Sequence, residues 1–447
     1  MTDTTPARPH PDATPAPTLA ATFAPTLAIR SDRGLVRAIH HSTRYLAVEV
    51  TAPTATATSV RPRVNVAFVL DRSGSMGGRK IELARDAVRQ GIARLAHDDR
   101  FAVVAYDHEI DVIAAGRPAT GEGKSAADRA IAAIEARGNT NLGGGWLSGA
   151  QQVAEALDPA AVNRVLLLTD GLANQGITNP SELTAHAAAL RARGVSTSTF
   201  GVGEDFDEAL LGAMADAGGG SFRFIGSPAD IPTLIAAEVG ELLEVTARGV
   251  QLRFATAGPA NGIQVEPIGA FAFEPKTGGG VVHLGDLVSD QVVRLVVALT
   301  FPMGEVDRTV GVELALVDAD GRVAHSETLT WRYADTLAND GQPRDREVDR
   351  LVARAYADRA LRDVVALNRR GELEQARHAL RAVAQRIRGY AGRDEVLRGI
   401  VDELEREAER WSVMQEEGTR KLAYSASAYR MKSRMAMGAP MRRDSND

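Results

Sequence analysis

The sequence predicts an α/β protein in which a doubly wound, mostly parallel β-sheet is inserted into an antiparallel β-sandwich and followed by a C-terminal α-helical region. Three observations lead to this fold class. Strand-like and helix-like patterns alternate over residues 62–243, strand-like runs follow one another without helices over residues 244–335, and apolar residues recur at helical spacing over residues 344–417. A chain of 447 residues is long enough for about three domains.

The N-terminal segment contains little that could fold by itself. Residues 1–17 are rich in Pro, Thr and Ala and are predicted to be disordered. Within residues 18–61, two segments favour strands, residues 18–29 and residues 45–52. Because a lone strand pair cannot bury its own apolar face, we expect residues 18–61 to supply the N-terminal strands of the sandwich that residues 244–335 continue.

A short apolar run over residues 64–70 begins the predicted doubly wound domain of residues 62–243. Such a run suits a central parallel strand that is buried on both faces. Helices are predicted over residues 79–96, 125–136, 146–157, 181–193, 207–217 and 229–244, and further strands over residues 101–106, 112–114, 165–168, 195–200 and 222–225. This alternation is typical of a parallel sheet covered by helices on both faces.

The pattern changes after this domain. Strand-like runs separated by Gly, Pro, Asp and Asn predict an antiparallel β-sandwich, and they cover residues 250–254, 281–284, 292–299, 310–316 and 322–331. Two apolar stripes with spacings of three and four then predict packed helices, and they comprise Leu373, Ala376, Leu380, Val383, Ile387 and Tyr390, and Leu397, Ile400, Leu404, Ala408, Trp411 and Met414.

The charge reverses near the C-terminus. Residues 402–417 are acidic, whereas the basic tail of residues 418–447 carries Lys and Arg with no acidic residue before position 444. Such a tail would suit an acidic partner, RNA or lipid. The alternative is that it folds back on the acidic helix or is solvated.

The composition of the chain argues against several classes of function. A net charge of -6 argues against a general nucleic-acid-binding surface, because phosphate contacts need clustered Lys and Arg. No apolar stretch is long enough for a membrane span, and residues 1–20 lack the basic start and apolar core of a secretory signal. The chain has no cysteine, which excludes thiolate chemistry and disulfides. We therefore expect a cytoplasmic protein.

Oxygen-bearing side chains follow two of the predicted strands. Asp71, Ser73 and Ser75 come directly after the first strand of the domain, and Asp170 follows the strand of residues 165–168. Thr140 adds a hydroxyl from a segment that reads as a glycine-rich loop. Asp, Ser and Gly also build ordinary turns, so the first three residues alone would be a weak signal. Ligands of open α/β sheets collect beyond the carboxyl ends of the strands, which favours a shared site.

On these segments the chain resembles the von Willebrand factor type A domain family, whose fold is Rossmann-like, over residues 62–243. The segments are similar to the metal-ion-dependent adhesion site of that family. The resemblance implies that Ser73, Ser75 and Thr140 contact the cation through their hydroxyls, and that Asp71 and Asp170 bind it directly or through water. The layout also resembles inter-alpha-trypsin inhibitor heavy chains and bacterial proteins with this domain.

The chemistry of this set agrees with the resemblance. Oxygen ligands without thiolate or imidazole suit Mg²⁺, Mn²⁺ or Ca²⁺. Two carboxylates only balance a divalent ion, so we expect modest affinity, on the order of 10⁻⁴ to 10⁻³ M, and one coordination position open to an Asp or Glu of a partner protein. The predicted function is a divalent-cation-dependent protein-binding module and not an enzyme. The resemblance further implies a partner protein such as a ring-forming ATPase of the AAA+ class.

Two other functions stay open at this stage. The C-terminal helices would make an oligomerising scaffold if the metal site were only structural. A metal-assisted hydrolase would need a positioned base, and Asp107 and His108 are the nearby candidates.

Overall fold

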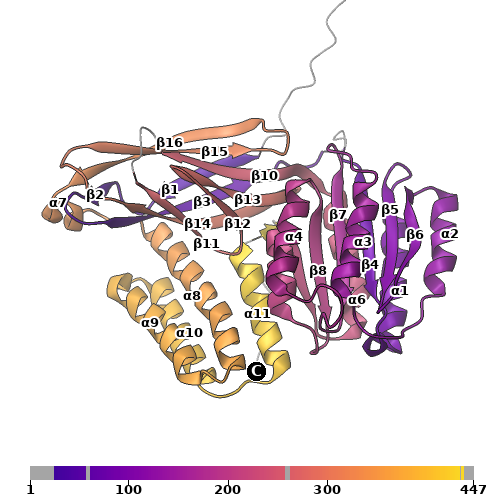
Figure 1. The fold of residues 1–447 in the computed structure, drawn as a ribbon. Helices are drawn as coiled ribbons and strands as arrows, with labels where there is room; N and C mark the ends of the chain where they lie inside the picture. Colours follow the sequence, from indigo (N-terminus) through magenta and orange to yellow (C-terminus); the bar gives the residue numbers. More distant parts are fainter. Residues whose placement is uncertain (1–24, 57–60, 257–261, 433, 437–447) are drawn as a thin grey trace, which may run out of the picture.

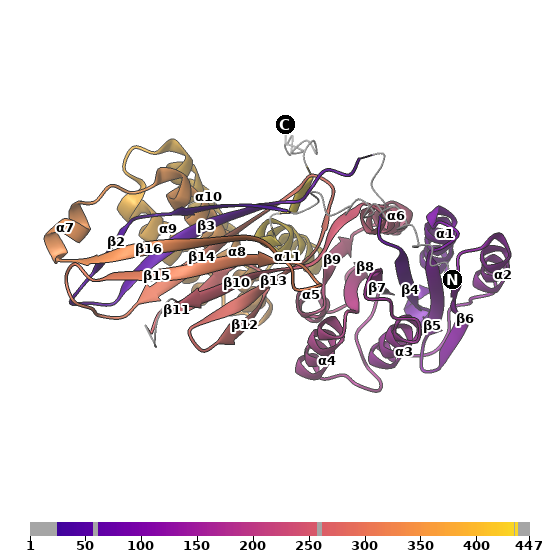
Figure 2. The same ribbon diagram turned by 90° about the horizontal axis from the view of Figure 1, so that it is seen from above.

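The computed structural model describes residues 25–56, 61–256, 262–432 and 434–436 (Figure 1). The predictions for residues 1–17 and for the first part of the strand at residues 18–29 lie outside the described residues. The described chain has three parts: a helix-covered sheet, a pair of sheets without intervening helices, and a C-terminal group of helices (Figures 1 and 2).

The first part confirms the predicted doubly wound sheet. Its described strands lie in the order β6-β5-β4-β7-β8-β9, and all neighbours are parallel except β5 and β6. The strands are β4 (Val64–Asp71), β5 (Arg100–Tyr106), β6 (Ile110–Pro118), β7 (Val162–Thr169), β8 (Ser196–Val202) and β9 (Gly219–Ile225). The helices are α1 (Arg79–Arg94), α2 (Gly121–Ala132), α3 (Leu142–Ala154), α4 (Pro180–Ala192), α5 (Glu208–Ala217) and α6 (Ile231–Leu243).

Alternation along the central strand explains why both faces are covered. Val66 and Phe68 of β4 belong to one core with α1, α2 and α6, whereas Ala67 and Val69 belong to another with α3, α4 and α5. Every residue of β4 is buried, as expected for a central parallel strand.

The second part consists of two sheets that share one hydrophobic core. The first has the order β1-β3-β14-β11, with β17 beside β14, and the second has the order β12-β13-β10-β15-β16-β2. The strands are β1 (Thr26–Ser31), β2 (Leu35–Arg37), β3 (Ser42–Thr51), β10 (Val245–Thr256), β11 (Gln264–Ile268), β12 (Ala272–Lys276), β13 (Gly279–Val288), β14 (Gln291–Phe301), β15 (Thr309–Val317), β16 (Val323–Ala334) and β17 (Arg434–Ala436). Val48 and Val297 of the first sheet and Leu252 and Val312 of the second lie in the same buried cluster.

The N-terminal strands meet strands from far along the chain. β3 pairs antiparallel with β14, from Thr51 opposite Val292 to Ser42 opposite Phe301. The segments before and after the doubly wound domain therefore belong to one sheet.

The third part confirms the helical C-terminal region. Its helices are α8 (Arg346–Arg369), α9 (Leu373–Ala391), α10 (Glu395–Arg410) and α11 (Glu417–Lys432), preceded by the short α7 (Thr336–Gly341). Leu380, Ile387, Leu397 and Leu404 of the two predicted stripes are buried in one cluster with α8. The stripes are thus used for packing within this chain.

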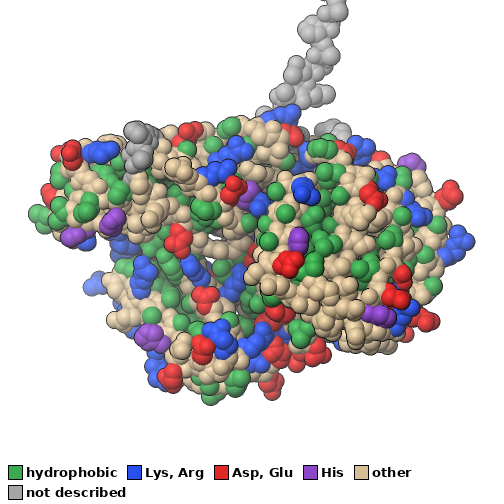
Figure 3. Space-filling model, viewed as in Figure 1, with side chains coloured by type: hydrophobic (Ala, Val, Ile, Leu, Met, Phe, Trp, Pro, Cys, Tyr) green, Lys and Arg blue, Asp and Glu red, His purple; other side chains and the backbone are tan. Residues whose placement is uncertain are grey.

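The described part of the basic segment, residues 418–432 and 434–436, is largely helical. α11 lies between α8 and the doubly wound domain (Figure 1). It does not pack on the acidic helix α10, so the alternative in which the tail folds back on that helix is wrong for these residues. Its cations face acidic residues elsewhere in the chain: Lys421 pairs with Glu208, Arg430 with Asp358 and Lys432 with Asp216. On the face drawn in Figure 3, basic and acidic side chains are interspersed, which does not favour nucleic acid as a ligand.

One helix begins earlier than its sequence pattern suggests. The run Gly143–Gly145 was predicted as loop, but it forms the first turn of α3. Glycine is needed where this helix packs closely on the sheet: an added Cβ at Gly145 would lie 2.3 Å from Cγ of Tyr106, and one at Gly149 would lie 2.2 Å from Cγ2 of Val69. These glycines let α3 approach strands β4 and β5.

We therefore expect Gly145→Ala to destabilise the protein by about 1–3 kcal/mol, because Tyr106 is fully buried and either its ring or α3 must shift. Urea unfolding measures the change. The matched control is Gly399→Ala in α10, where nothing lies within 4 Å of an added Cβ. That variant should gain about 0.5–1 kcal/mol, and equal effects at the two positions would contradict the packing argument.

Among the described helices, none is both long enough and apolar enough to cross a membrane.

Candidate cation site

The site lies where β4 and β7 end. The two strands are parallel neighbours, with Leu70 opposite Leu168, so Asp71 and Asp170 project from the same edge of the sheet. Asp71 is the last residue of β4, and the chain then turns through a short 3₁₀ segment, Gly74–Met76, before α1. This is the carboxyl edge, where open α/β sheets bind ligands.

Hydrogen bonds connect four of the five predicted residues, and Thr140 lies close to them. Ser73 Oγ lies 3.1 Å from Ser75 Oγ, and Ser75 Oγ donates to Asp170 Oδ1 at 2.6 Å. Asp71 Oδ1 accepts from the backbone N–H of Ser73 at 2.7 Å. Thr140 Oγ1 and Ser75 Oγ lie 3.5 and 3.8 Å from the position that a Cβ on Gly171 would take. The structure therefore brings all five residues together.

Three residues that the sequence did not single out support this arrangement. Thr169 donates its hydroxyl to Asp71 Oδ2 at 2.6 Å, and Asn174 Oδ1 accepts from the backbone N–H of Thr140 at 3.0 Å. Lys80 Nζ lies 2.5 Å from Asp170 Oδ2. Thr169 and Asn174 flank Asp170 closely in sequence, but nothing in their local pattern indicates what they bind.

The two buried carboxylates of the site need a positive charge nearby. Asp71 and Asp170 are both fully buried. Burial, aided by the nearby charge of Asp170, raises the pKa of Asp71 to about 6 in spite of its hydrogen bonds. Asp170 has Lys80, but within the described part of the chain no basic side chain lies within ion-pair distance of Asp71. A buried carboxylate without a cationic partner is costly, so this oxygen set fits a divalent cation.

Asp107 does not provide a catalytic base beside this site. Its carboxylate is buried and accepts from Arg137 Nε at 2.8 Å and from the backbone N–H of Glu109 at 2.7 Å, with Arg72 Nε 3.5 Å away. Burial acts to raise the pKa of Asp107, but the hydrogen bond from Glu109 and the two arginine charges outweigh it and hold that pKa below its ordinary value. A carboxylate so neutralised is a poor proton acceptor.

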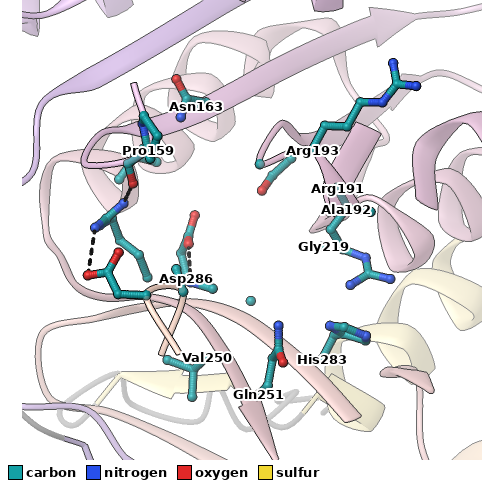
Figure 4. A pocket seen from close by; sticks show the side chains of 18 of the residues that line it. Pro159, Asn163, Arg191, Ala192, Arg193, Gly219, Val250, Gln251, His283 and Asp286 are labelled. Atoms are coloured by element: carbon teal, nitrogen blue, oxygen red, sulfur yellow. Dashed lines mark hydrogen bonds and ion pairs between the residues drawn. The ribbon is translucent and has the colours of Figure 1, made fainter. Parts of the chain in front are cut away.

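A separate cavity lies away from this site. Its volume is about 460 Å³, and it opens between the doubly wound domain and the second sheet (Figure 4). The carboxylates in its wall already have partners: Asp286 pairs with Arg164 at 2.8 Å, and Asp320 lies 3.9 Å from Arg248. Its wall includes Val162 and Asn163 at the start of β7, whereas Asp170 follows the end of that strand.

His283 in this cavity predicts a pH dependence. Burial, together with the adjacent charge of Arg191 (Figure 4) and that of Lys276, lowers the pKa of His283 to about 4, and Glu274, 3.7 Å away, only partly opposes this. Above pH 6.5 the imidazole of His283 is neutral in both the folded and the unfolded protein, so its titration does not lower the stability there. Between pH 6.5 and 4 only the unfolded state takes up the proton, and about 1–2 kcal/mol should be lost, allowing for partial solvent screening.

Urea unfolding of the wild type and His283→Gln at pH 7 and pH 4.5 checks this. The stability difference between the two proteins should shift in favour of the variant at the lower pH. An identical pH dependence would contradict the assignment.

The comparisons with known proteins agree with this fold. Residues 65–236 match the von Willebrand factor type A domain, so the chain contains a domain of this family. The solved structure of a von Willebrand factor type A protein from Catenulispora acidiphila aligns with a TM-score of 0.70 at 18% identity and covers 92% of this chain and 98% of its own. The ArnB paralog VWA2 from Sulfolobus acidocaldarius aligns with a TM-score of 0.60 at 18% identity over the same shares. At these identities the likeness concerns the fold alone.

Curated relatives match part of this chain. The protein YfbK of Escherichia coli (strain K12) is 30% identical over 192 residues, which are 42% of this chain and 33% of YfbK. Inter-alpha-trypsin inhibitor heavy chain H4 of Homo sapiens is 32% identical over 172 residues, which are 37% of this chain and 18% of the heavy chain. The chain thus spans a third or less of these two relatives. Domains of this family are commonly metal-dependent protein-interaction modules.

Proposed function

We propose that this protein is a divalent-cation-dependent protein-binding module in which Asp71, Ser73, Ser75, Thr140 and Asp170 hold Mg²⁺, Mn²⁺ or Ca²⁺. The observation that carries the proposal is the meeting of two fully buried carboxylates with three hydroxyls at the carboxyl edge of the sheet. When bound, the cation would offer one coordination position to an Asp or Glu of the partner.

The second part of the chain provides a platform for this module. We infer that residues 18–61 and 244–335 form one β-sandwich into which the domain is inserted. Support comes from the pairing of β3 with β14 and from the core that the two sheets share. A cytoplasmic location and an AAA+ ATPase among the partners belong to the same proposal, and fractionation and affinity capture test them.

Capture of the partner tests the function directly. The immobilised protein should retain its partner in Mg²⁺ and release it in EDTA, and Asp71→Ala and Thr140→Ala should retain none. The matched control is Asp98→Ala, because Asp98 is exposed and precedes β5 at the opposite edge of the same sheet. Equal capture by Asp71→Ala and the wild type, with and without EDTA, would refute the mechanism.

An oligomerising scaffold has less support. The apolar stripes of α9 and α10 are buried against α8 within the same chain, which leaves those seams occupied. A hydrolase has less support still, since Asp107 is neutralised by arginines.

A further inference from the structure

A smaller cavity lies at the seam between the first sheet and the C-terminal helices. Its volume is about 230 Å³, and strand β3 and helices α8 and α9 contribute most of its wall. Pockets for drug-sized ligands usually measure about 300–1,000 Å³, so an occupant here would be smaller, such as one ring with one substituent. Unlike the larger cavity, this one has no carboxylate in its wall.

Aromatic and apolar groups form the body of this cavity. Tyr45, Tyr356 and Tyr390 line it together with Val352 and Ile387. The rings of Tyr45 and Tyr356 meet edge to face with centroids 6.1 Å apart, and their hydroxyls are 3.3 Å apart. Such a wall accepts a flat apolar ring and offers phenolic O–H groups to an oxygen at its edge.

Three arginines surround the same space. Arg33, Arg344 and Arg386 line the cavity, and the guanidinium groups of Arg344 and Arg386 lie 4.9 and 5.2 Å from the ring centroids of Tyr390 and Tyr356. These contacts hold the cations at the aromatic wall.

Two of the arginines pair with buried carboxylates, and among the described residues the third does not. Asp32 lies 3.2 Å from Arg33, and Asp349 lies 2.5 Å from Arg344, and both carboxylates are buried. Among the described residues, Arg386 has the hydroxyl of Tyr45 at 3.3 Å as its hydrogen-bond partner and the ring of Tyr356 beside it. In the described ranges no carboxylate lies within ion-pair distance of it.

Charged residues near this cavity add to its positive charge. Glu266, an acidic residue near Tyr356, pairs with Arg359 at 3.1 Å. The buried Arg44 is held by the carbonyls of Leu35 and Thr43 and has no carboxylate partner among the described residues. Burial, and then the charges of Arg33 and Arg344, lower the pKa of Arg44 to about 10. The seam therefore carries more positive than negative charge, with Arg44 buried and Arg386 exposed.

We propose that this cavity binds a small aromatic anion, with its ring among the three tyrosines and its carboxylate or phosphate on Arg386 and the hydroxyl of Tyr45. The binding site is independent of the cation site. A ligand here touches β3, α8 and α9 at once, so it ties the sheet to the helical region.

Binding of phenyl phosphate to the full-length protein, followed by ligand-observed NMR and calorimetry, tests the proposal. Inorganic phosphate and phenol serve as the anion-only and ring-only probes, and both should bind at least about tenfold more weakly than phenyl phosphate. Benzoate should compete with phenyl phosphate. Arg386→Gln should weaken phenyl phosphate binding at least about tenfold, because a charge-assisted hydrogen bond is lost. Tyr45→Phe should weaken it less, since the ring is retained.

Arg388→Gln on the same helix is the matched control. Arg388 is exposed and pairs with Glu405 outside the cavity, so its replacement should leave binding unchanged. Arg386 is itself exposed, and circular dichroism and the unfolding midpoint of each variant establish that it is folded. Absence of phenyl phosphate binding, equal binding of phenol or phosphate, or equal losses in Arg386→Gln and Arg388→Gln would each overturn the proposal.

Discussion

Adding Mg²⁺ is expected to stabilise the wild-type protein against urea and to leave Asp71→Asn unchanged. A ligand that binds only the folded state stabilises it in proportion to the logarithm of its concentration over the dissociation constant. With a dissociation constant of about 10⁻⁴ to 10⁻³ M, 10 mM Mg²⁺ should add roughly 1–3 kcal/mol to the free energy of unfolding. Asp71→Asn removes one of the two carboxylates that neutralise the ion, so it should gain almost nothing.

The same variant has a second expected result without metal. In EDTA, Asp71→Asn should be at least as stable as the wild type, because it replaces a buried charge that has no basic partner among the described residues. Asp98→Asn is the control for charge, and it should respond to Mg²⁺ like the wild type. An equal gain in Asp71→Asn, or no gain in the wild type, would contradict the cation site.

The cation site could be predicted because its signals are local. Asp71 and Asp170 each follow an apolar run that ends at the same edge of a parallel sheet, and Ser73 and Ser75 lie within four residues of Asp71. Their meeting point then follows from the general geometry of α/β sheets. The supporting contacts from Lys80, Thr169 and Asn174 have no such signal, since Lys, Thr and Asn are common in helices and turns.

Other elements could not be predicted for two physical reasons. β11 and β12 are short and expose many of their side chains, so they show little alternation. Gly145 and Gly149 of α3 lie where Tyr106 and Val69 leave no room for a Cβ, and a single sequence does not reveal such an approach of helix and sheet. In both cases the tertiary contacts decide the local structure.

The basic C-terminal segment illustrates the same limit. The sequence left open a ligand-binding tail, a tail folded back on the acidic helix and a solvated tail. It could not decide among them because a buried Lys requires a partner, and the partner of Lys421 is Glu208, 213 positions away. Only the folded chain brings the two together, between α11 and α5. Lys421 is fully buried, its ammonium lies 2.9 Å from Glu208 Oε2, and it sits 4.1 Å from the ring centroid of Phe206.

Lys421→Met is therefore expected to destabilise the protein by about 3 kcal/mol. Removing one member of a buried ion pair typically costs about 3–5 kcal/mol, because the other charge is left in the interior. The lower end applies here, since Arg369 also lies 2.7 Å from Glu208 and still neutralises it. The free energy of unfolding in urea measures the loss.

The size of this loss decides whether α11 is an integral part of the fold or a detachable tail. Lys276→Met is the control, because Lys276 is more than half exposed and its replacement should change stability by less than about 0.5 kcal/mol. If α11 only rested on the surface, the two variants would behave alike. A large loss at Lys421 alone would mean that the loop after β8, where the carbonyl of Phe206 accepts from Lys421, depends on the last helix for its position. The von Willebrand factor type A domain would then need the C-terminal region of its own chain to be stable.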